Sequence, residues 1–330
     1  MRKRVKYLVW LMAVLLLVGC QQKPKVGFLM DTLTIERWKK DKALFEEKVV
    51  ELGGIPFVEV ADSDPEKQLK QAQKLIDEGI EVLVIIPVDL EKAGEIVKLA
   101  HRNYIPVISY DRLIKDCMLD YYIATDNINI GELQADYLTK IKPKGKYALI
   151  GGATTDNNAF LLHLGWMNVL QPFIERGDIE IVVNEFSRYW LPDEAYQILI
   201  AYMSENPDID AVICGNDALA SGAIMALREH EKDGRVLVAG QDADIQAVRN
   251  IVSGSQTITI YKPIESLAFA AANAAIKISD GEAPSNMNIT VNNGKHLVPA
   301  ILLQAQVVNR QNIKMTVISE GFLGEKEIYN

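Results

Sequence analysis

The sequence predicts an α/β protein made of two doubly wound domains, each with a parallel sheet. From residue 25 onward, short apolar runs rich in Val and Ile alternate with stretches of helical period. The runs are almost continuously apolar, which is typical of strands that helices cover on both faces. Ten such runs can be counted, more than one compact sheet usually holds, so we expect two sheets.

The elements follow one another in a regular order, and several helix starts are marked. Asp64 precedes Pro65, which supplies a capping oxygen and then a residue already fixed at helical φ. Strands are expected at residues 25–31, 56–62, 82–89, 106–112, 121–127, 146–153, 179–186, 211–217, 236–243 and 257–262. The main helices are expected at residues 36–52, 65–78, 130–141, 193–203 and 264–278.

The first twenty residues are predicted to be an export signal rather than part of the fold. Basic residues at positions 2–4 and 6 precede an apolar stretch at 8–18, which is shorter than the roughly 20 residues that span a membrane. The following "LVGC" resembles the lipobox of bacterial lipoproteins, in which the cysteine is lipidated. We therefore expect residues 1–20 to be a lipoprotein signal peptide, with Cys20 acylated and the protein tethered outside the cytoplasm. An ordinary signal peptide is less favoured, because no A-x-A-like site precedes residue 25.

Charge and motif content exclude several classes of function. The net charge is -9 and no run of Lys or Arg follows residue 6, which argues against a nucleic-acid partner. Cys117 and Cys214 are far apart and have no metal-ligand spacing, so both are expected to be free thiols. No phosphate-binding loop, dinucleotide fingerprint or nucleophile elbow is present. We therefore expect a protein that is not an enzyme and that has no metal or cofactor.

Polar residues recur where the predicted strands end. In open α/β sheets, ligands bind outside the carboxyl ends of the strands. A single acid at such a position is as often a helix cap or turn former, but a set at equivalent edges of both domains indicates two polar walls facing across a cleft. The set comprises Asp31, Asp89, Asp111, Arg112, Asp126, Asn127, Asn216, Asp217, Asp242 and Lys262.

Two tryptophans lie near the same predicted cleft. Trp38 comes shortly after the first strand and Trp190 shortly before a helix start, whereas Trp166 lies inside a helical stretch and is expected in the core. A flat aromatic ring can cover the C–H face of a sugar while acids, amides and Arg bind its hydroxyls. Arg112 beside Asp111 should keep that carboxylate ionised, which disfavours general acid chemistry.

Taken together, the motifs resemble the periplasmic sugar-binding proteins of ABC transporters of the ribose/galactose type, and among them the branch that binds D-xylose. The resemblance runs from about Lys25 to Phe322. One departure is Arg188 with Tyr189, where the family tends to carry small residues. The motifs are "ERWKKD" (36–41), "VLVIIP" (82–87), "YDR" (110–112), "DNINIGELQA" (126–135), "DNNA" (156–159), "WLPD" (190–193), "GNDA" (215–218), "GQDAD" (240–244) and "YKPI" (261–264).

The resemblance implies a type I periplasmic binding protein, which closes two hinged domains on one monosaccharide. It implies D-xylose as the sugar and an ABC transporter permease as the partner. A membrane sensor kinase or chemoreceptor, and another pentose or hexose, remain alternatives. A DNA-binding regulator of the same fold is disfavoured by the export signal. The implied ligand-binding residues are Arg37, Asp111 and Arg112 from the first domain, Asn157, Asn216 and Asp242 from the second, Lys262 at a crossing strand, Trp190 against the ring, and Trp38 and Asp156 in or just behind the contact layer.

No low-complexity linker separates the halves, so several segments are expected to cross between the domains. The candidates are residues 126–129, 258–261 and 291–295, where strands end in polar residues. We therefore expect a first domain of residues 25–126 and 262–291, and a second of residues 127–261 and 292–330.

Overall fold

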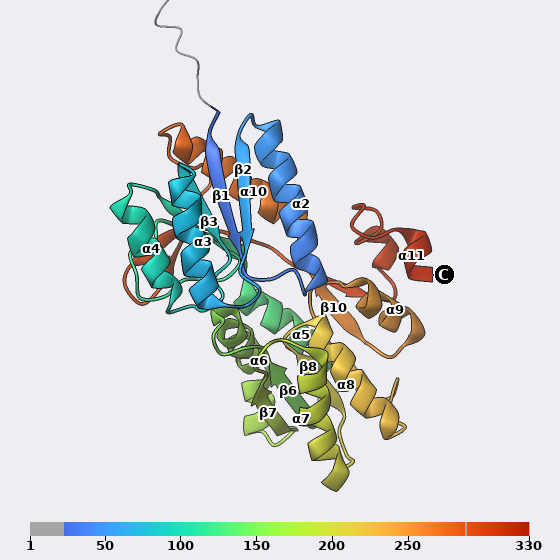
Figure 1. Ribbon diagram of the computed structural model, residues 1–330. Coiled ribbons are helices and arrows are strands. Elements are labelled where there is room, and N and C mark those ends of the chain that lie inside the picture. The colour runs from blue at the N-terminus through green and yellow to red at the C-terminus, as the bar shows by residue number, and fades with distance from the viewer. Residues whose placement is uncertain (1–22, 288, 330) are drawn as a thin grey trace, which may run out of the picture.

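The computed structural model describes residues 23–287 and 289–329, which form two lobes, each built around one sheet (Figure 1). In the described residues the sheet of the first lobe has seven strands in the order β11-β12-β5-β4-β3-β1-β2. All neighbours are parallel except the edge pair of β11 and β12. The strands are β1 (Lys25–Met30), β2 (Ile55–Val60), β3 (Val82–Ile85), β4 (Val107–Tyr110), β5 (Tyr121–Thr125), β11 (Ile289–Asn292) and β12 (Leu297–Leu303).

The sheet of the second lobe has six strands within the described ranges, in the order β13-β10-β9-β8-β6-β7. Only β13, at the edge, runs antiparallel to its neighbour. The prediction of two α/β domains with parallel sheets is therefore confirmed, with one antiparallel edge strand in each sheet. The strands are β6 (Gly145–Gly151), β7 (Ile179–Phe186), β8 (Ala211–Cys214), β9 (Leu237–Ala239), β10 (Ile258–Tyr261) and β13 (Gln306–Asn309).

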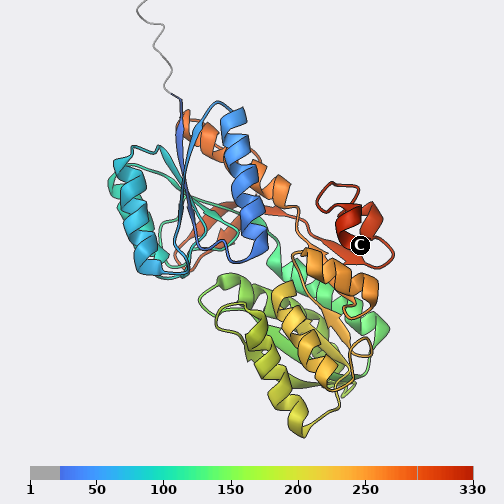
Figure 2. The ribbon, with the colours of Figure 1, turned by 45° about the vertical axis from the view of Figure 1, so that its right-hand side comes forward.

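Helices cover both faces of the first sheet (Figure 2). On one face, α2 (Glu36–Glu51) and α10 (Ile264–Ser279) share a buried cluster with the strands, which includes Phe45 and Leu267. On the other face, α3 (Pro65–Asp77) and α4 (Ala93–Arg102) bury Leu75 and Ile96. This two-sided burial is why the strand residues are apolar on both faces. The helices of the second lobe are α5 (Asn127–Ile141), α6 (Asn157–Glu175), α7 (Pro192–Glu205), α8 (Asp217–Glu229) and α9 (Ile245–Ser253).

The marked start of α3 shows how local sequence fixes an element. Asp64 accepts hydrogen bonds from the backbone N–H groups of Glu66 (2.9 Å) and Lys67 (3.1 Å), and Pro65 is the first helical residue. The predicted cap is confirmed. Its removal would cost about 1 kcal/mol of stability.

The chain crosses between the lobes three times in its described part. The first crossing joins β5 to α5 and the second joins β10 to α10. The third is the two-residue link, Gln304 and Ala305, between β12 of the first sheet and β13 of the second. The expected crossing at 291–295, and with it the domain boundary after residue 291, is wrong. Those residues turn the β11–β12 hairpin, where Gly294 takes a left-handed φ of 92°, and the chain stays in the first lobe up to Leu303.

The C-terminal part of the chain packs beside α9 at the edge of the second lobe (Figure 2). It contains a short 3₁₀ helix (Ile313–Met315) and α11 (Glu325–Tyr329). Lys40 of α2 donates to the backbone oxygen of Phe322 (3.1 Å), so this segment also contacts the first lobe. Within the described ranges, the helices are too short or too polar to cross a membrane. Cys20 lies outside the described residues.

Candidate functional site

The first wall of the site is formed by buried residues that directly follow strands of the first sheet. Asp31 follows β1, and Asp111 and Arg112 follow β4. Asp111 has a left-handed φ of 62°, and its carbonyl oxygen accepts a hydrogen bond from the Tyr122 hydroxyl (2.9 Å). This turn ends the apolar strand and places an acid and a base at the carboxyl edge of the sheet, where ligands of this fold class bind.

Arg37, in the first turn of α2, links carboxylates of both lobes. Its guanidinium lies 2.6 Å from Asp111, 3.2 Å from Asp41 and 3.7 Å from Asp242 of the second lobe. Burial works to lower the pKa of Arg37, but these carboxylates outweigh it, so the pKa lies well above its ordinary value. Burial works to raise the pKa of Asp111, but Arg37 and Lys262 outweigh it and the pKa is lowered. Arg37 and Asp111 are therefore a charged pair at neutral pH.

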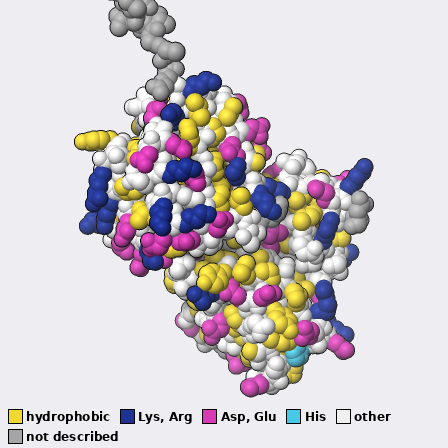
Figure 3. All heavy atoms as spheres, in the orientation of Figure 1, with side chains coloured by type: hydrophobic (Ala, Val, Ile, Leu, Met, Phe, Trp, Pro, Cys, Tyr) yellow, Lys and Arg dark blue, Asp and Glu magenta, His cyan; other side chains and the backbone are white. Residues whose placement is uncertain are grey.

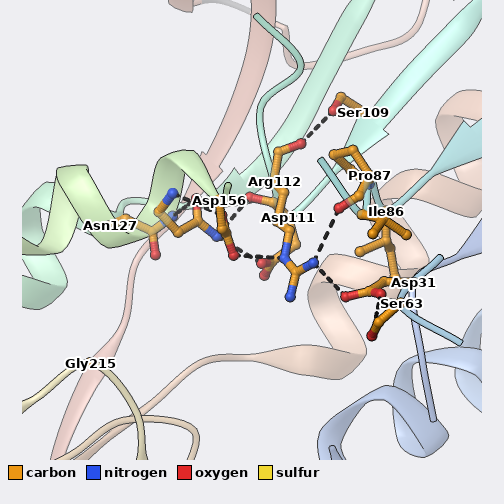
Figure 4. A network of polar contacts seen from close by, with 12 residues as sticks. Asp31, Ser63, Ile86, Pro87, Ser109, Asp111, Arg112, Asn127, Asp156 and Gly215 are labelled. Carbon is orange, nitrogen blue, oxygen red and sulfur yellow. Dashed lines mark hydrogen bonds and ion pairs between the residues drawn. The ribbon is translucent and has the colours of Figure 1, made fainter. Parts of the chain in front are cut away.

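Like Arg37, Arg112 contacts carboxylates of both lobes (Figure 4). Its Nη1 lies 2.6 Å from Asp31 and donates to the carbonyl oxygen of Pro87 (3.1 Å), both in the first lobe. Its Nε lies 2.7 Å from Asp156 of the second lobe. The planar guanidinium suits this double pairing, because it presents several N–H donors in a fixed fork.

The second wall is formed by strand ends and helix starts of the second lobe. Asn216, after β8, caps α8 by accepting from the N–H of Leu219 (2.8 Å). Asp242, after β9, lies 2.7 Å from the ammonium of Lys262, which follows β10 at the second crossing. All of these side chains except that of Leu219 are polar, and all are at least nine-tenths buried. Such groups are stable in a protein interior only when they are paired or meet a ligand.

At one predicted position the cavity is lined by the neighbouring residue, Asn158, instead of Asn157. Asn157 was expected to face the ligand, but the side chain that reaches the first wall is that of Asn158. Asn158 donates to the Asp111 carboxylate (2.9 Å) and accepts from Asn127 (3.0 Å). Both asparagines lie in the first turn of α6, where successive side chains point about 100° apart. Only one of the pair can therefore face the opposite wall.

Trp190 is held in the site by close contact with two glycines. It has a left-handed φ of 61°, and its ring lies against the backbone of Gly152 and Gly215. A Cβ at these glycines would come within 2.1 Å and 2.9 Å of the indole, respectively. Trp38, on α2, stacks under the guanidinium of Arg37, with 4.4 Å from its carbon to a ring centroid. Both tryptophans thus occupy fixed positions at the site.

These residues line a cavity between the lobes with about 340 Å³ of empty space, part of it open to solvent, which we call the inner cavity. All predicted ligand-binding residues except Asn157 line it. The sequence reasoning missed Ile35, Asn158 and Gln241, although Gln241 could have been inferred from its place at the same strand end as Asp242. The lining is Ile35, Arg37, Trp38, Asp111, Arg112, Asp156, Asn158, Trp190, Asn216, Gln241, Asp242 and Lys262.

Besides Nε of Arg112 and Oδ1 of Asp242, which are in ion pairs, three buried polar atoms of the inner cavity have no hydrogen-bond partner among the described residues. They are Nε1 of Trp38, Nε1 of Trp190 and Oε1 of Gln241. An unsatisfied buried group costs about 1–3 kcal/mol, so a ligand that pairs with it gains affinity. Two donors and one acceptor suit hydroxyl groups, because a hydroxyl both accepts and donates. The cavity therefore suits an uncharged molecule rich in hydroxyls.

Behind Asp242 lies a further buried carboxylate, Asp217. It accepts hydrogen bonds from Gln256 (2.8 Å), from the hydroxyl of Thr259 (2.7 Å) and from the backbone N–H of Asp244 (3.0 Å). All three donors are uncharged. Burial and the nearby charge of Asp244 raise the pKa of Asp217 well above its ordinary value.

Asp244 is expected to make the protein less stable as the pH rises from about 4 to 7. Burial and the negative Asp242 raise its pKa from the ordinary 3.8 to about 7. The folded state therefore binds this proton more tightly than the unfolded state does, and stability is lost as the proton leaves. Because Asp244 is only partly buried, Asp244→Asn should stabilise the protein at pH 8 by only about 1–2 kcal/mol. Urea unfolding at pH 5 and pH 8 measures this, with the exposed Asp280→Asn as control. A gain at pH 5 equal to that at pH 8 would contradict it.

Neither of the two described cysteines lines the inner cavity. Cys117 and Cys214 are free and buried, as predicted. Burial raises the pKa of Cys117 to about 11, so it is a thiol and a weak nucleophile at neutral pH. Among the described residues, no cluster of His, Cys, Asp and Glu is arranged to hold a metal ion.

Comparisons with known proteins agree with this geometry. Residues 26–283 match the Periplasmic binding protein domain family. The D-xylose-binding periplasmic protein of Escherichia coli (strain K12) is 43% identical over 305 residues, which cover 92% of this chain and 92% of that protein. The D-xylose-binding periplasmic protein of Haemophilus influenzae is 42% identical over 307 residues, 93% of this chain and 92% of that protein.

A solved structure of similar fold comes from Clostridium phytofermentans. It is an ABC transporter solute binding protein with bound β-D-glucose, with a TM-score of 0.86 and 28% identity, covering 92% of this chain and 99% of that one. The resemblance noted in the sequence motifs is thereby confirmed. The chain belongs to the periplasmic sugar-binding proteins, which are receptors and not enzymes.

Proposed function

We propose that this protein is an extracytoplasmic receptor that binds one molecule of D-xylose between its lobes and delivers it to an ABC transporter permease. The choice of D-xylose rests on the relatives of 43% and 42% identity, which are D-xylose-binding proteins. The residues proposed to bind the sugar are Arg37, Trp38, Asp111, Arg112, Asp156, Asn158, Trp190, Asn216, Asp242 and Lys262.

The observation that carries the proposal is the set of ion pairs that spans the inner cavity. Arg112 contacts Asp31 in the first lobe and Asp156 in the second, and Arg37 contacts Asp111 and Asp242 likewise. A sugar hydroxyl that bonds to these groups touches both lobes at once. Since a ligand shifts a conformational equilibrium only by binding one state more tightly, contacts to both lobes favour the closed state.

The charged side chains that line the inner cavity can account for micromolar affinity for a sugar. A hydrogen bond to a charged group contributes about 1.5–3 kcal/mol. Several such bonds, with an aromatic ring against one sugar face, reach micromolar or tighter binding, about -8 kcal/mol, after the cost of association.

Calorimetry with xylose, ribose, arabinose, glucose and galactose tests which sugar the protein binds most tightly. We expect xylose to bind most tightly and the inner cavity to discriminate against the exocyclic CH₂OH of hexoses. Glucose is the rival ligand, because structures with 28% identity contain it. If glucose binds with a lower dissociation constant than xylose, glucose replaces xylose as the proposed ligand. The proposal that the protein is a sugar receptor then still stands.

The lipid anchor at Cys20 is also part of the proposal. Strand β1 begins at Lys25, so an acyl group on Cys20 would hold the first lobe close to the membrane surface. Metabolic labelling with an alkyne fatty acid should mark the wild-type protein and leave Cys20→Ser unlabelled. The variant should move from the membrane fraction to the soluble fraction, since two or more acyl chains are needed for stable anchoring. Equal membrane association of both proteins would exclude the anchor.

A further inference from the structure

A second and larger cavity borders the inner cavity. It contains about 1060 Å³ of empty space, part of it open to solvent, and we call it the outer cavity. The two cavities share four lining residues: Ile35, Arg112, Asp156 and Trp190. The two cavities therefore adjoin at these four residues.

The outer cavity exists although the lobes already touch. The backbone N–H of Leu90 in the first lobe donates to the carbonyl oxygen of Thr155 in the second (3.0 Å). Arg112 and Asp156 also pair across the lobes at 2.7 Å. The lobes therefore touch beside this space, which exceeds what an exocyclic CH₂OH on a single ring would fill.

The wall that the first lobe contributes is rich in hydroxyls and carboxylates. Asp31 accepts a hydrogen bond from the Ser63 hydroxyl (3.0 Å), and Thr32 accepts one from the N–H of Thr34 (3.1 Å). Asp89 lies on the same wall. Side chains of this kind can donate to and accept from the hydroxyls of a sugar.

The wall that the second lobe contributes presents an aromatic ring. Tyr189 is 50% exposed and lines the outer cavity, and the guanidinium of Arg188 lies 4.8 Å from its ring centroid. Figure 3 shows hydrophobic side chains on the second lobe just below the boundary between the lobes. In the outer cavity an aromatic ring thus faces a polar wall, as it does in the inner cavity.

The segment that carries this ring is fixed before any ligand binds. The Glu194 carboxylate accepts from the backbone N–H groups of Arg188 (3.0 Å), Tyr189 (2.9 Å) and Leu191 (3.3 Å). Trp190, between them, packs on two glycines as described above. Because the backbone is already ordered, binding at Tyr189 costs little conformational entropy.

We propose that the outer cavity is a second sugar subsite, so that the receptor also takes a pentose disaccharide. The inference rests on the proposed function: the first ring occupies the inner cavity, and the second lies against Tyr189 and faces the hydroxyl wall of the first lobe. The glycosidic oxygen then lies near the shared residues Arg112, Asp156 and Trp190. Arg188 and Tyr189 are the residues that the second lobe contributes to the aromatic side of this subsite.

Calorimetry with xylose and xylobiose on the purified protein tests the inference. Xylobiose should bind with a dissociation constant within about tenfold of that for xylose. Tyr189→Ala should weaken xylobiose about tenfold more than it weakens xylose, because one buried aromatic face is lost. Tyr189→Phe should restore xylobiose binding, since the ring remains. Tyr104→Ala, which removes a ring that is 96% exposed outside both cavities, should affect neither sugar.

The outcomes separate the two proposals. Binding of xylose without xylobiose overturns the second subsite and leaves the receptor for one monosaccharide. Equal loss of both sugars in Tyr189→Ala also overturns it. Absence of binding to every sugar tested overturns the proposed function and the subsite together.

Discussion

Arg112→Ala is expected to abolish detectable binding of D-xylose, a loss of at least about 100-fold. In the proposed site the guanidinium, paired with Asp31 and Asp156, is the group that would meet the ligand, and each hydrogen bond to a charged group contributes about 1.5–3 kcal/mol. Removing it also leaves two buried carboxylates without this partner, which should cost about 3–5 kcal/mol of folding stability. Calorimetry gives the affinity, and urea unfolding gives the stability.

A second substitution separates the loss of binding from the loss of stability. Arg112→Lys keeps the positive charge but loses the planar fork of N–H donors. It should therefore be more stable than Arg112→Ala, but its affinity for xylose should remain far below that of the wild type. Arg235→Ala, at an exposed position, is the matched control and should behave like the wild type. An unchanged dissociation constant in folded Arg112→Ala protein would refute the assignment.

Gly152→Ala is the second substitution with a large expected effect. The added Cβ would lie 2.1 Å from the Trp190 indole, so the ring must move out of the position it holds in both cavities. We expect a loss of xylose affinity of about tenfold or more, and a loss of stability of about 1–3 kcal/mol from overpacking. Because Trp190 lines the site, its fluorescence should change in the ligand-free variant.

The control for this prediction is the same change at Gly94, inside α4. A Cβ there would meet its nearest atom, Cβ of Cys117, at an ordinary 3.4 Å. Gly94→Ala should therefore leave affinity unchanged and raise helix stability by up to about 1 kcal/mol. Wild-type affinity and fluorescence in Gly152→Ala would show that the indole position does not matter for binding.

Much of the fold could be predicted because its signals are local. The buried strands carry unbroken Val and Ile runs, and the start of α3 carries both a capping Asp and a proline. Strands β11 and β13 lie at sheet edges and are short and partly exposed, with mixed polar and apolar residues. Nothing in that pattern tells a hairpin of the first lobe from a crossing to the second, which is why residues 291–295 were misplaced.

The site could be predicted as a set of strand ends but not as a network. The rule that polar residues gather at the carboxyl edge selected Asp111, Arg112 and Asp242 correctly as neighbours. It could not choose between Asn157 and Asn158, since that depends on the rotation of α6 about its axis. Nor could it show that Arg112 pairs with Asp156, because this contact depends on how the two lobes are placed.

The three links between the lobes also bear on how the lobes can move relative to each other. Two of them run side by side and are bonded to each other, since the N–H of Asp126 donates to the carbonyl oxygen of Leu303 (3.0 Å). A twist of one lobe against the other would slide these two segments past each other, whereas a hinge bend leaves the hydrogen bond intact. This hydrogen bond therefore favours a hinge bend over a twist as the relative motion of the lobes.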